Sequence, residues 1–446
     1  MKNFGRNFII AFLMVLTIYQ TGELWFGNFS DHNFFSLFNN SETTYSKNVA
    51  YTLNRLIVNL GDNKVICRGS DIYGSEYKTL FDKSVSTALL KGAVTENTGD
   101  VDWNNVLNNR AIIYEYSCTF EGSDLSGIFN VKSDNCSKVK TYDTIIISPR
   151  ADNSLMRVVF YDSEKNTSTT IDLKSDSIIG QCYETSSEFV NNDEGIYYIS
   201  SVENGFNIFS GNKFLPQSQS EIYSYSAIEP HLTLTDKTMV EKNASIFFDN
   251  AAAKSYTKNE GTYSFSDETS VVKFYNNNVL EYFNYSTKSK TDSSFSANYV
   301  AAINIIKRDS FITNEFYLDS YTLKEGQYVF YFNYKINDLT IVPGENIKRL
   351  TGMNSMIEVT VSEGSVDKYK KYACRYTVSE KINLNAKVDF VSAVDEIYEG
   401  LYKGANKAEK VDDITLSYIA ETKPFGLSWI VDINNEKFVV ATDGQV

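Results

Sequence analysis

The pattern of apolar and polar positions is uneven along the chain, and its longest apolar run comes first. FIIAFLMVLTIY (Phe8–Tyr19) carries no charge, and QTGELWF (Gln20–Phe26) continues the run with polar residues near its far end. A helix needs about 20 predominantly apolar residues to cross about 30 Å of hydrocarbon. Residues 8–26 therefore predict one transmembrane helix.

The charges that flank this run predict its orientation. Lys2 and Arg6 precede it, whereas no basic residue follows before Lys47. Because basic residues stay on the cytoplasmic side of a membrane, we expect residues 1–7 to form a cytoplasmic tail and the bulk of the chain to be extracellular. The predicted location is the cell membrane, with a single pass.

A cleaved signal peptide is the alternative interpretation of the same run. Cleavage requires small residues in an A-x-A-like arrangement. The positions available at the end of the run, Tyr19-Gln20-Thr21 and Gln20-Thr21-Gly22, each begin with a bulky side chain. A lipid-modified cysteine is also disfavoured, because the first cysteine is Cys67. An uncleaved anchor is the favoured interpretation.

One face of the predicted helix carries small and hydroxyl-bearing side chains, which allow two transmembrane helices to approach closely. An ordinary anchor whose polar residues lie near the interface explains the same pattern equally well. The residues that we predict to contact a partner, or to lie at the outer interface beside it, are Ala11, Met14, Thr17, Ile18, Gln20, Thr21 and Trp25.

A polar and aromatic juxtamembrane segment, residues 27–46, leads to a region of alternating helix and strand patterns. Between the predicted helices, runs rich in β-branched and aromatic residues end at turn signals such as Asn276-Asn277-Asn278 and predict antiparallel strands. Strands are also expected at residues 195–200 and 205–209. Helical spacing or a helical turn is found over residues 48–61, 75–92, 102–109, 240–255, 296–307 and 390–404.

The order of these elements predicts the fold class. A helix followed by antiparallel strands occurs about three times, and each helix is expected to cover one sheet face. The predicted class is α+β, with an N-terminal transmembrane helix followed by β-rich extracytoplasmic domains of antiparallel sheets, each covered by helices. A crossing segment at residues 215–230 separates the predicted N-terminal domain, residues 47–230, from a C-terminal region, residues 231–446, of one or two subdomains.

The composition supports packed domains and restricts the partners. Hydrophobic residues make up 42% of the chain and aromatic residues 14%, which is enough for packed cores and argues against intrinsic disorder. The net charge of −14 repels nucleic acid and anionic lipid headgroups. Solubility of an exported domain is the favoured explanation of that charge.

The cysteines and histidines provide few sites for chemistry. None of the five cysteines forms a C-x-x-C motif, which disfavours zinc and thioredoxin-like sites. An exported chain could pair Cys118 with Cys136, or all five thiols could stay reduced, and both alternatives are open. The only histidines are His32 and His231, so a His-rich metal site or a His-dependent catalytic triad is disfavoured.

Motifs of catalysis are absent from the sequence. There is no G-x-x-x-x-G-K-[ST] phosphate loop, no G-x-S-x-G elbow and no kinase core. Asp100 with Asp102, and Asp412 with Asp413, are candidate acid–base pairs, but neighbouring acids on loops are usually solvated or capping groups. The sequence therefore predicts no enzyme activity, no cofactor and no catalytic or metal-binding residue.

Three stretches resemble the YycH and YycI family of Gram-positive bacteria. They are TIYQTGELWFGNFSDHNFF (Thr17–Phe35), RAIIYEYSCTF (Arg110–Phe120) and the ending Asp413–Val446, which is similar to a PepSY-like module. The length of 446 residues is nearer the YycH type. Proteins of this family are single-pass, extracytoplasmic regulators of an essential cell-wall histidine kinase.

The resemblance implies a non-enzymatic regulator in a two-component signal-transduction system. Its implied partners are the sensor histidine kinase and a sister YycI- or YycH-type regulator, held in a hetero-oligomer. The matching positions for such contacts are in the predicted transmembrane helix, above all Thr17, Gln20 and Thr21.

Two other functions are compatible with the sequence. A cell-envelope binding module would recognise peptidoglycan or peptide through the abundant Tyr and Phe side chains. An envelope hydrolase would require a cleft that gathers carboxylates, or a Cys with a His, and two histidines leave little room for the latter.

Overall fold

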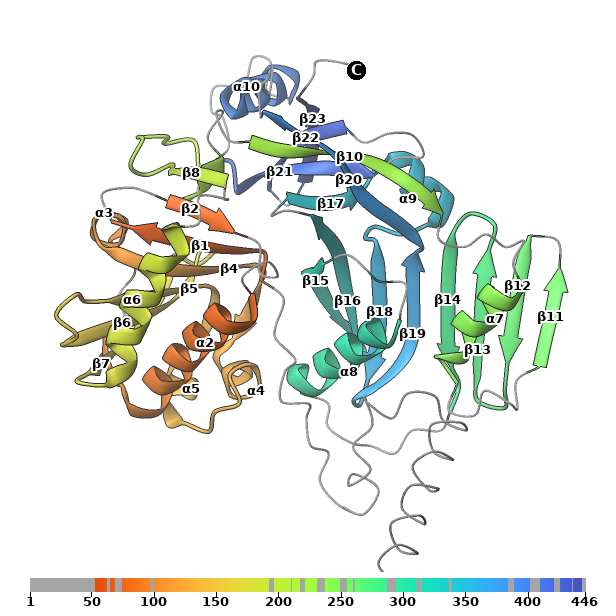
Figure 1. Ribbon diagram of the computed structural model, residues 1–446, viewed down its shortest axis with the longest axis horizontal. Helices are drawn as coiled ribbons and strands as arrows, with labels where there is room; N and C mark the ends of the chain where they lie inside the picture. Colours follow the sequence, from red (N-terminus) through yellow and green to blue (C-terminus); the bar gives the residue numbers. More distant parts are fainter. Residues whose placement is uncertain are drawn as a thin grey trace, which may run out of the picture. The chain divides into compact units, whose positions relative to one another are not determined.

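Figure 1 shows the computed structural model of the protein. The chain divides into Met1–Asn48 and Val49–Val446, and all described residues belong to the second part. They are residues 53–442 except for 62–64, 69–73, 97–98, 100, 192–195, 210, 217–220, 231–236, 249–254, 260, 287–293, 310–311, 313–314, 337–338, 384–388, 402–409, 421–425 and 435.

The predicted transmembrane helix and juxtamembrane segment lie outside the described residues. The same is true of every partner-contact residue predicted from the sequence: Ala11, Met14, Thr17, Ile18, Gln20, Thr21 and Trp25. Within the part of the chain that the structure describes, none of the helices combines the length and apolar character needed to cross a membrane.

The first half of the described chain builds a nine-stranded sheet in which every neighbouring pair is antiparallel. In spatial order its strands are β3 (Ala93–Glu96), β7 (Thr167–Lys174), β6 (Leu155–Asp162), β5 (Thr141–Pro149), β4 (Arg110–Glu121), β1 (Arg55–Leu60), β2 (Val65–Arg68), β8 (Ile196–Ser200) and β9 (Phe214–Pro216).

Two helices, α2 (Gly74–Lys91) and α6 (Ser177–Asn191), lie side by side across one face of this sheet (Figure 1). Phe81, Val85 and Leu89 follow the helical period of α2 and are fully buried. The shorter helices of this half are α3 (Trp103–Asn108), the 3₁₀-helix η3 (Gly122–Asp124), α4 (Leu125–Ile128) and α5 (Asp134–Lys138).

The second half builds a twelve-stranded sheet. Its neighbouring strands are antiparallel apart from β17 and β21, which pair in parallel. In spatial order they are β11 (Ser255–Asn259), β12 (Thr262–Ser266), β13 (Ser270–Tyr275), β14 (Val279–Asn284), β19 (Ser365–Tyr372), β18 (Ile357–Ser362), β16 (Gln327–Ile336), β17 (Leu339–Pro343), β21 (Asp413–Ala420), β22 (Gly426–Ile433) and β23 (Glu436–Ala441), with β15 (Glu315–Lys324) paired to β16.

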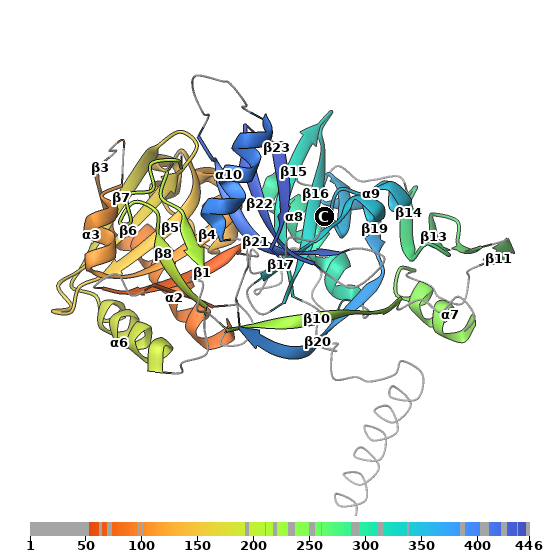
Figure 2. The same ribbon diagram turned by 90° about the horizontal axis from the view of Figure 1, so that it is seen from above.

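Helices also cover parts of the second sheet. The helix α8 (Phe295–Arg308) lies against β16, β18 and β19, and α10 (Phe390–Leu401) lies against β22 and β23. The others are α7 (Lys237–Ser245) and α9 (Glu345–Thr351). A separate antiparallel ribbon of β10 (Glu221–Pro230) and β20 (Cys374–Asn383) is seen from its side in Figure 2.

Side chains of the two halves contact each other directly. The rings of Phe120 on β4 and Phe295 on α8 meet edge to face, with centroids 5.5 Å apart. The Tyr321 hydroxyl donates to the carbonyl oxygen of Thr119 at 3.1 Å. The domain boundary near residue 230 stays a prediction.

Most predicted elements are confirmed, as is the α+β class with antiparallel sheets. Residues 75–92, 102–109, 296–307 and 390–404 contain α2, α3, α8 and α10. The predicted turns also occur, and Asn278 adopts a φ of 63° between β13 and β14. Asparagine tolerates this left-handed conformation better than most residues.

Other predictions are wrong. The helix expected over residues 48–61 is β1 at residues 55–60, because RLIVNL is buried on both faces and pairs with β2 and β4. Residues 205–208 form turns or irregular structure, and Phe209 makes only an isolated parallel bridge with Val411, so the strand expected at residues 205–209 does not form. The helix expected at residues 240–255 ends at Ser245 in α7, and β11 begins at Ser255. The structure also contains α6 and α9, which the sequence did not predict.

The three cysteines whose side chains are described, Cys118, Cys136 and Cys182, are free thiols. The alternative of a Cys118–Cys136 disulfide is therefore wrong for this structure. Cys136 and Cys182 are buried in the core, where a cysteine behaves as a small apolar side chain.

Candidate functional site

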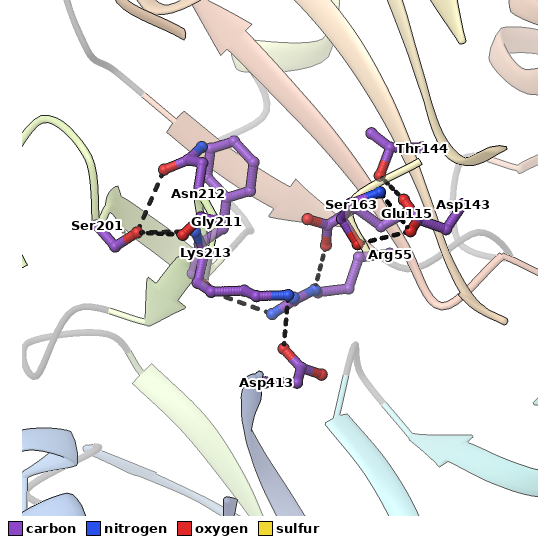
Figure 3. A network of polar contacts seen from close by, with 11 residues as sticks. Arg55, Glu115, Asp143, Thr144, Ser163, Ser201, Gly211, Asn212, Lys213 and Asp413 are labelled. Carbon is purple, nitrogen blue, oxygen red and sulfur yellow. Dashed lines mark hydrogen bonds and ion pairs between the residues drawn. The ribbon is translucent and has the colours of Figure 1, made fainter. Parts of the chain in front are cut away.

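A cavity of about 710 Å³ is lined by residues of both halves of the described chain. Its walls come from β1, β4 and β5 on one side, and from β15, β21, β22 and β23 on the other. This volume is within the range of about 300–1,000 Å³ that is usual for ligand pockets. Figure 3 shows the polar network in its wall.

Arg55, the first residue of β1, lies at the centre of this network (Figure 3). Its Nε donates to Oε2 of Glu115 on β4 at 2.6 Å, and its Nη1 donates to the carbonyl oxygen of Phe214 at 3.1 Å. Arg55 and Glu115 stand directly opposite each other in the strand register. Their side chains are 9% and 14% exposed, so salt screens this ion pair far less than a surface pair.

Lys213 and Asp413 connect the two walls of the cavity (Figure 3). The Lys213 Nζ lies 3.7 Å from Oδ1 of Asp413, whose side chain is 41% exposed. Partial burial raises the pKa of the Asp413 carboxyl, but the positive charges of Lys213 and Arg55 outweigh it and leave the pKa below its usual value. Asp413 is therefore a carboxylate at neutral pH.

Asp143 on β5 is a structural part of the wall. Thr144 Oγ1 donates to its Oδ1 at 2.7 Å, and the backbone N and Oγ of Ser163 donate to its Oδ2 at 2.9 and 2.6 Å. Burial raises the pKa of Asp143, although these hydrogen bonds oppose the shift. The two bonds from Ser163 tie β5 to the turn that follows β6, which fixes this part of the cavity.

Two buried donors in the wall have no hydrogen-bond partner among the described residues: Trp103 Nε1 and Asn212 Nδ2. The two residues are 7% and 8% exposed. The amide of Asn212 is held by its oxygen, which accepts from Ser200 Oγ at 2.6 Å and Ser201 Oγ at 3.4 Å. In Figure 3 its nitrogen therefore points away from Ser201.

A second cavity, of about 400 Å³, shares part of this wall. Trp103, Tyr161 and Asn212 line both cavities. The rings of Trp103 and Tyr161 meet edge to face, with centroids 5.9 Å apart. The two residues with unpartnered donors therefore belong to a wall that both cavities share.

Neither the Cys118 thiol nor the Tyr317 phenol in the wall is activated as a nucleophile. Burial, with the negative charges of Asp319 and Asp143, raises the pKa of the Cys118 thiol far above its usual value, which keeps it protonated and unreactive. Burial also raises the pKa of Tyr317 well above its usual value. Among the described residues, no group of three or more His, Cys, Asp or Glu side chains could hold a metal ion. The wall offers hydrogen-bond donors, hydrogen-bond acceptors and charges in fixed positions, which suit the binding of a ligand.

The acidic neighbours noted in the sequence have local roles. Asp102 caps α3 by accepting from the backbone N of Asn105 at 3.1 Å. Asp412 accepts from the backbone N of Asn434 at 2.7 Å. Three residues weighed for catalysis lie outside the described residues: Asp100, His32 and His231.

The sequence did not indicate that Arg55, Glu115 and Lys213 belong to one site. Arg55 and Glu115 are 60 residues apart. One signal was available in the sequence. Arg55 and Glu115 are each a charged residue within an otherwise apolar strand pattern, Arg55 in RLIVNL and Glu115 in AIIYEYS. A charge buried in a strand requires a partner, so two such charges on neighbouring strands are candidates to pair.

No protein-family model matches the chain, and no curated protein matches it. The fold is similar to the crystal structure of YycH from Bacillus subtilis, with a TM-score of 0.51 and 11% sequence identity. The match covers 90% of this chain and 98% of that chain. The YycH-like fold expected from the resemblance is confirmed at the level of fold, and the YycI-like and PepSY-like relationships stay predictions.

Proposed function

We propose that this protein is a membrane-anchored, non-enzymatic regulator of a two-component sensor histidine kinase that controls cell-wall metabolism. The observation that carries the proposal is the YycH-like fold over 90% of the chain. An apolar run of transmembrane length at residues 8–26 supports it, because proteins of the resembled family act on the kinase as single-pass membrane proteins.

The proposed mechanism is contact with the kinase, and with a sister regulator, through the transmembrane helix and the outer domains. Such contact regulates the kinase only if it binds one signalling state more tightly than the other. Thr17, Gln20 and Thr21 are the proposed contact positions, since hydroxyl and amide groups in hydrocarbon gain from a hydrogen-bond partner.

The test is affinity purification of the full-length protein from solubilised membranes, beside a variant that lacks Met1–Phe26. Recovery of a histidine kinase by the full-length chain alone supports regulation through the transmembrane helix. Recovery by both variants places the contact in the outer domains. Absence of any kinase from both overturns the proposal and favours the envelope-binding alternative.

A matched pair of variants tests the contact positions. Thr17→Leu/Gln20→Leu removes the polar groups of the proposed face, and we expect kinase recovery to fall while the outer domains stay folded. Phe12→Leu/Tyr19→Phe changes two residues that lie two turns apart on the opposite helical face, and we expect recovery to be unchanged. Equal recovery with both variants contradicts the assignment of this face.

A further inference from the structure

We propose that the outer edge of β23 is a docking site for a second copy of this chain, and that the two β23 strands pair antiparallel about a two-fold axis. The pairing joins the second sheets of the two copies and is independent of the proposed contact between the transmembrane helix and a kinase. Three features of β23 support it: its place at the end of the sheet, the exposure of Val439, and a register in which the strand complements itself.

The backbone of β23 presents hydrogen-bonding groups on its outer edge. Among the described strands β23 pairs with β22 alone, at the end of the twelve-stranded sheet (Figure 1). Thr442 directly follows β23, and its backbone N donates to the carbonyl oxygen of Leu427 at 3.1 Å. Since hydrogen-bonded and non-hydrogen-bonded pairs alternate along an antiparallel ladder, every second residue before Thr442 also bonds to β22. The residues between them direct their N–H and C=O groups away from β22: Lys437, Val439 and Ala441.

The side chain at the centre of this edge is apolar and exposed. Val439 is 55% exposed, although valine is favoured in strands because it packs on a half-buried surface. An exposed apolar edge strand is a template for pairing with another chain, and proteins usually protect such edges with proline, a bulge or a short strand. β23 has none of these protections, because it runs for six residues without proline and without a shift in its register with β22.

The other edge strands among the described residues carry such protections or are polar. β3 has a register shift after Val94, and β9 has three residues and ends at Pro216. β15 has a register shift after Leu318 and lies against β4. β11 (SYTKN) carries no aliphatic side chain. Of these edges, β23 is therefore the one most suited to pair with another strand.

One antiparallel register makes β23 complementary to itself. The register centred on Val439 places Val439 opposite the same residue of the second copy and Lys437 opposite Ala441, so that all three residues with outward backbone groups are paired. Phe438 then lies opposite Val440. Aromatic and β-branched side chains form favourable pairs across strands, and no two like charges face each other. This self-complementarity favours a second copy over a foreign strand.

The symmetry and the size of the contact determine how it can be measured. A two-fold contact closes at two copies instead of growing into a filament. One six-residue strand from each copy buries much less surface than the roughly 1,600 Å² of a standard stable interface. The dimer therefore dissociates readily, and covalent trapping is the suitable measurement.

The test is disulfide trapping of the purified full-length protein in lipid vesicles under mild oxidation. Val439→Cys places two thiols opposite each other in a hydrogen-bonded pair, whose Cα atoms are about 5.5 Å apart and within the span of about 4.4–6.8 Å that a disulfide bridges. Lys437→Cys is the matched control. Lys437 is similarly exposed, at 57%, but lies about 14 Å along the strand from the same residue of the second copy.

We expect Val439→Cys to form the disulfide-linked dimer about tenfold faster than Lys437→Cys, with the wild-type protein as the reference for its native cysteines. Absence of a dimer from Val439→Cys above that reference overturns the proposal. Equal rates for the two variants also overturn it, because a dimer held by the transmembrane helix alone, or random collision, gives no preference between them.

A pair of charge variants tests the register. In the Val439→Cys background, Ala441→Lys places an ammonium group opposite Lys437 of the second copy, whereas Ala441→Glu places a carboxylate there. Like charges directly opposite each other destabilise a strand pair and opposite charges stabilise it. We expect the glutamate variant to be trapped about threefold to tenfold faster than the lysine variant, and equal rates would overturn the assigned register.

Discussion

Asp309 and Lys371 form an ion pair in the interior beneath α8. The Lys371 Nζ lies 2.5 Å from Oδ2 of Asp309, and the side chains are 1% and 0% exposed, respectively. The Tyr369 hydroxyl donates to the same carboxylate oxygen at 2.9 Å. Asp309 is the C-terminal cap of α8, while Lys371 and Tyr369 belong to β19, so the cluster fastens this helix to the sheet.

Replacing Asp309 alone should destabilise the fold strongly. Asp309→Leu removes the carboxylate that pairs with the buried Lys371 ammonium, and breaking a buried pair in this way costs about 3–5 kcal/mol. With a urea m-value of about 3 kcal/mol/M, the unfolding midpoint should fall by about 1–1.7 M. The double variant Asp309→Leu/Lys371→Met should recover most of this loss, because apolar replacements of a buried pair are often neutral or stabilising.

The loss of stability caused by Asp309→Leu should also depend on pH. Burial lowers the pKa of Lys371, while Asp309 opposes the shift. Without Asp309, the pKa of the lysine in the folded state falls further below the value of about 10.4 in the unfolded chain. The unfolded state then binds more protons, so stability rises with pH. We expect the deficit of Asp309→Leu to shrink between pH 7 and pH 10.

The assay is urea unfolding followed by tryptophan fluorescence in a Trp25→Phe background. Trp429 in β22 of the second half is 2% exposed, and Trp103 in α3 of the first half is 7% exposed, so both halves contribute to the signal. Tyr369→Phe added to the double variant removes the hydroxyl that has lost its acceptor. This third substitution should recover any free energy of unfolding that the double variant still lacks. A double variant as unstable as the single one refutes the reasoning, because the uncompensated charge would then not be the cause.

Two other buried groups give predictions for the first half. Asn59 Nδ2 donates to the carbonyl oxygens of Val106, Leu107 and Asn109 at 2.9, 2.9 and 2.7 Å, so Asn59→Leu should lower the free energy of unfolding by roughly 2–4 kcal/mol, measured by urea unfolding. Burial raises the pKa of Asp124 to about 6, above the value of about 3.9 in an unfolded chain. The folded state therefore binds more protons between these values, and this contribution to stability is lost as pH rises from about 4 to about 6. Asp124→Asn should remove that pH dependence, and an unchanged profile of the unfolding midpoint against pH would contradict the assignment.

Helices and turns that are determined by residues close together in the sequence could be predicted. The helix α8 shows this, because Tyr299, Ile303 and Ile306 are fully buried on one face and Ser294 caps its start by accepting from the backbone N of Ala297. Both features are visible in the sequence. Turns were predictable for the same reason, and Gly326 at the tip between β15 and β16 adopts a φ of 81°, which glycine adopts without strain.

Elements that are stabilised by contacts with residues far away in the sequence could not be predicted. RLIVNL in β1 is buried on both faces, so it lacks the period of two that marks a half-buried strand, and its apolar residues also fit helical spacing. In α6, SIIGQCYETSSEFVN contains serine, threonine and glycine, which weaken a helical pattern. Packing against α2 and the sheet stabilises α6 beyond its intrinsic propensity.

The candidate site follows from strand register, which explains why spacing along the chain did not indicate it. Arg55 meets Glu115 only because β1 pairs with β4 in one alignment, with Leu56 opposite Tyr114. A slip of one residue would place Arg55 opposite Tyr114 or Tyr116 and would turn every side chain of β1 to the other face. The buried apolar residues of β1 oppose that slip, because it would remove them from the positions that fit their neighbours. The apolar core thus fixes the charged groups of the cavity, and the polar chemistry of the cavity depends on the packing of residues that do not line it.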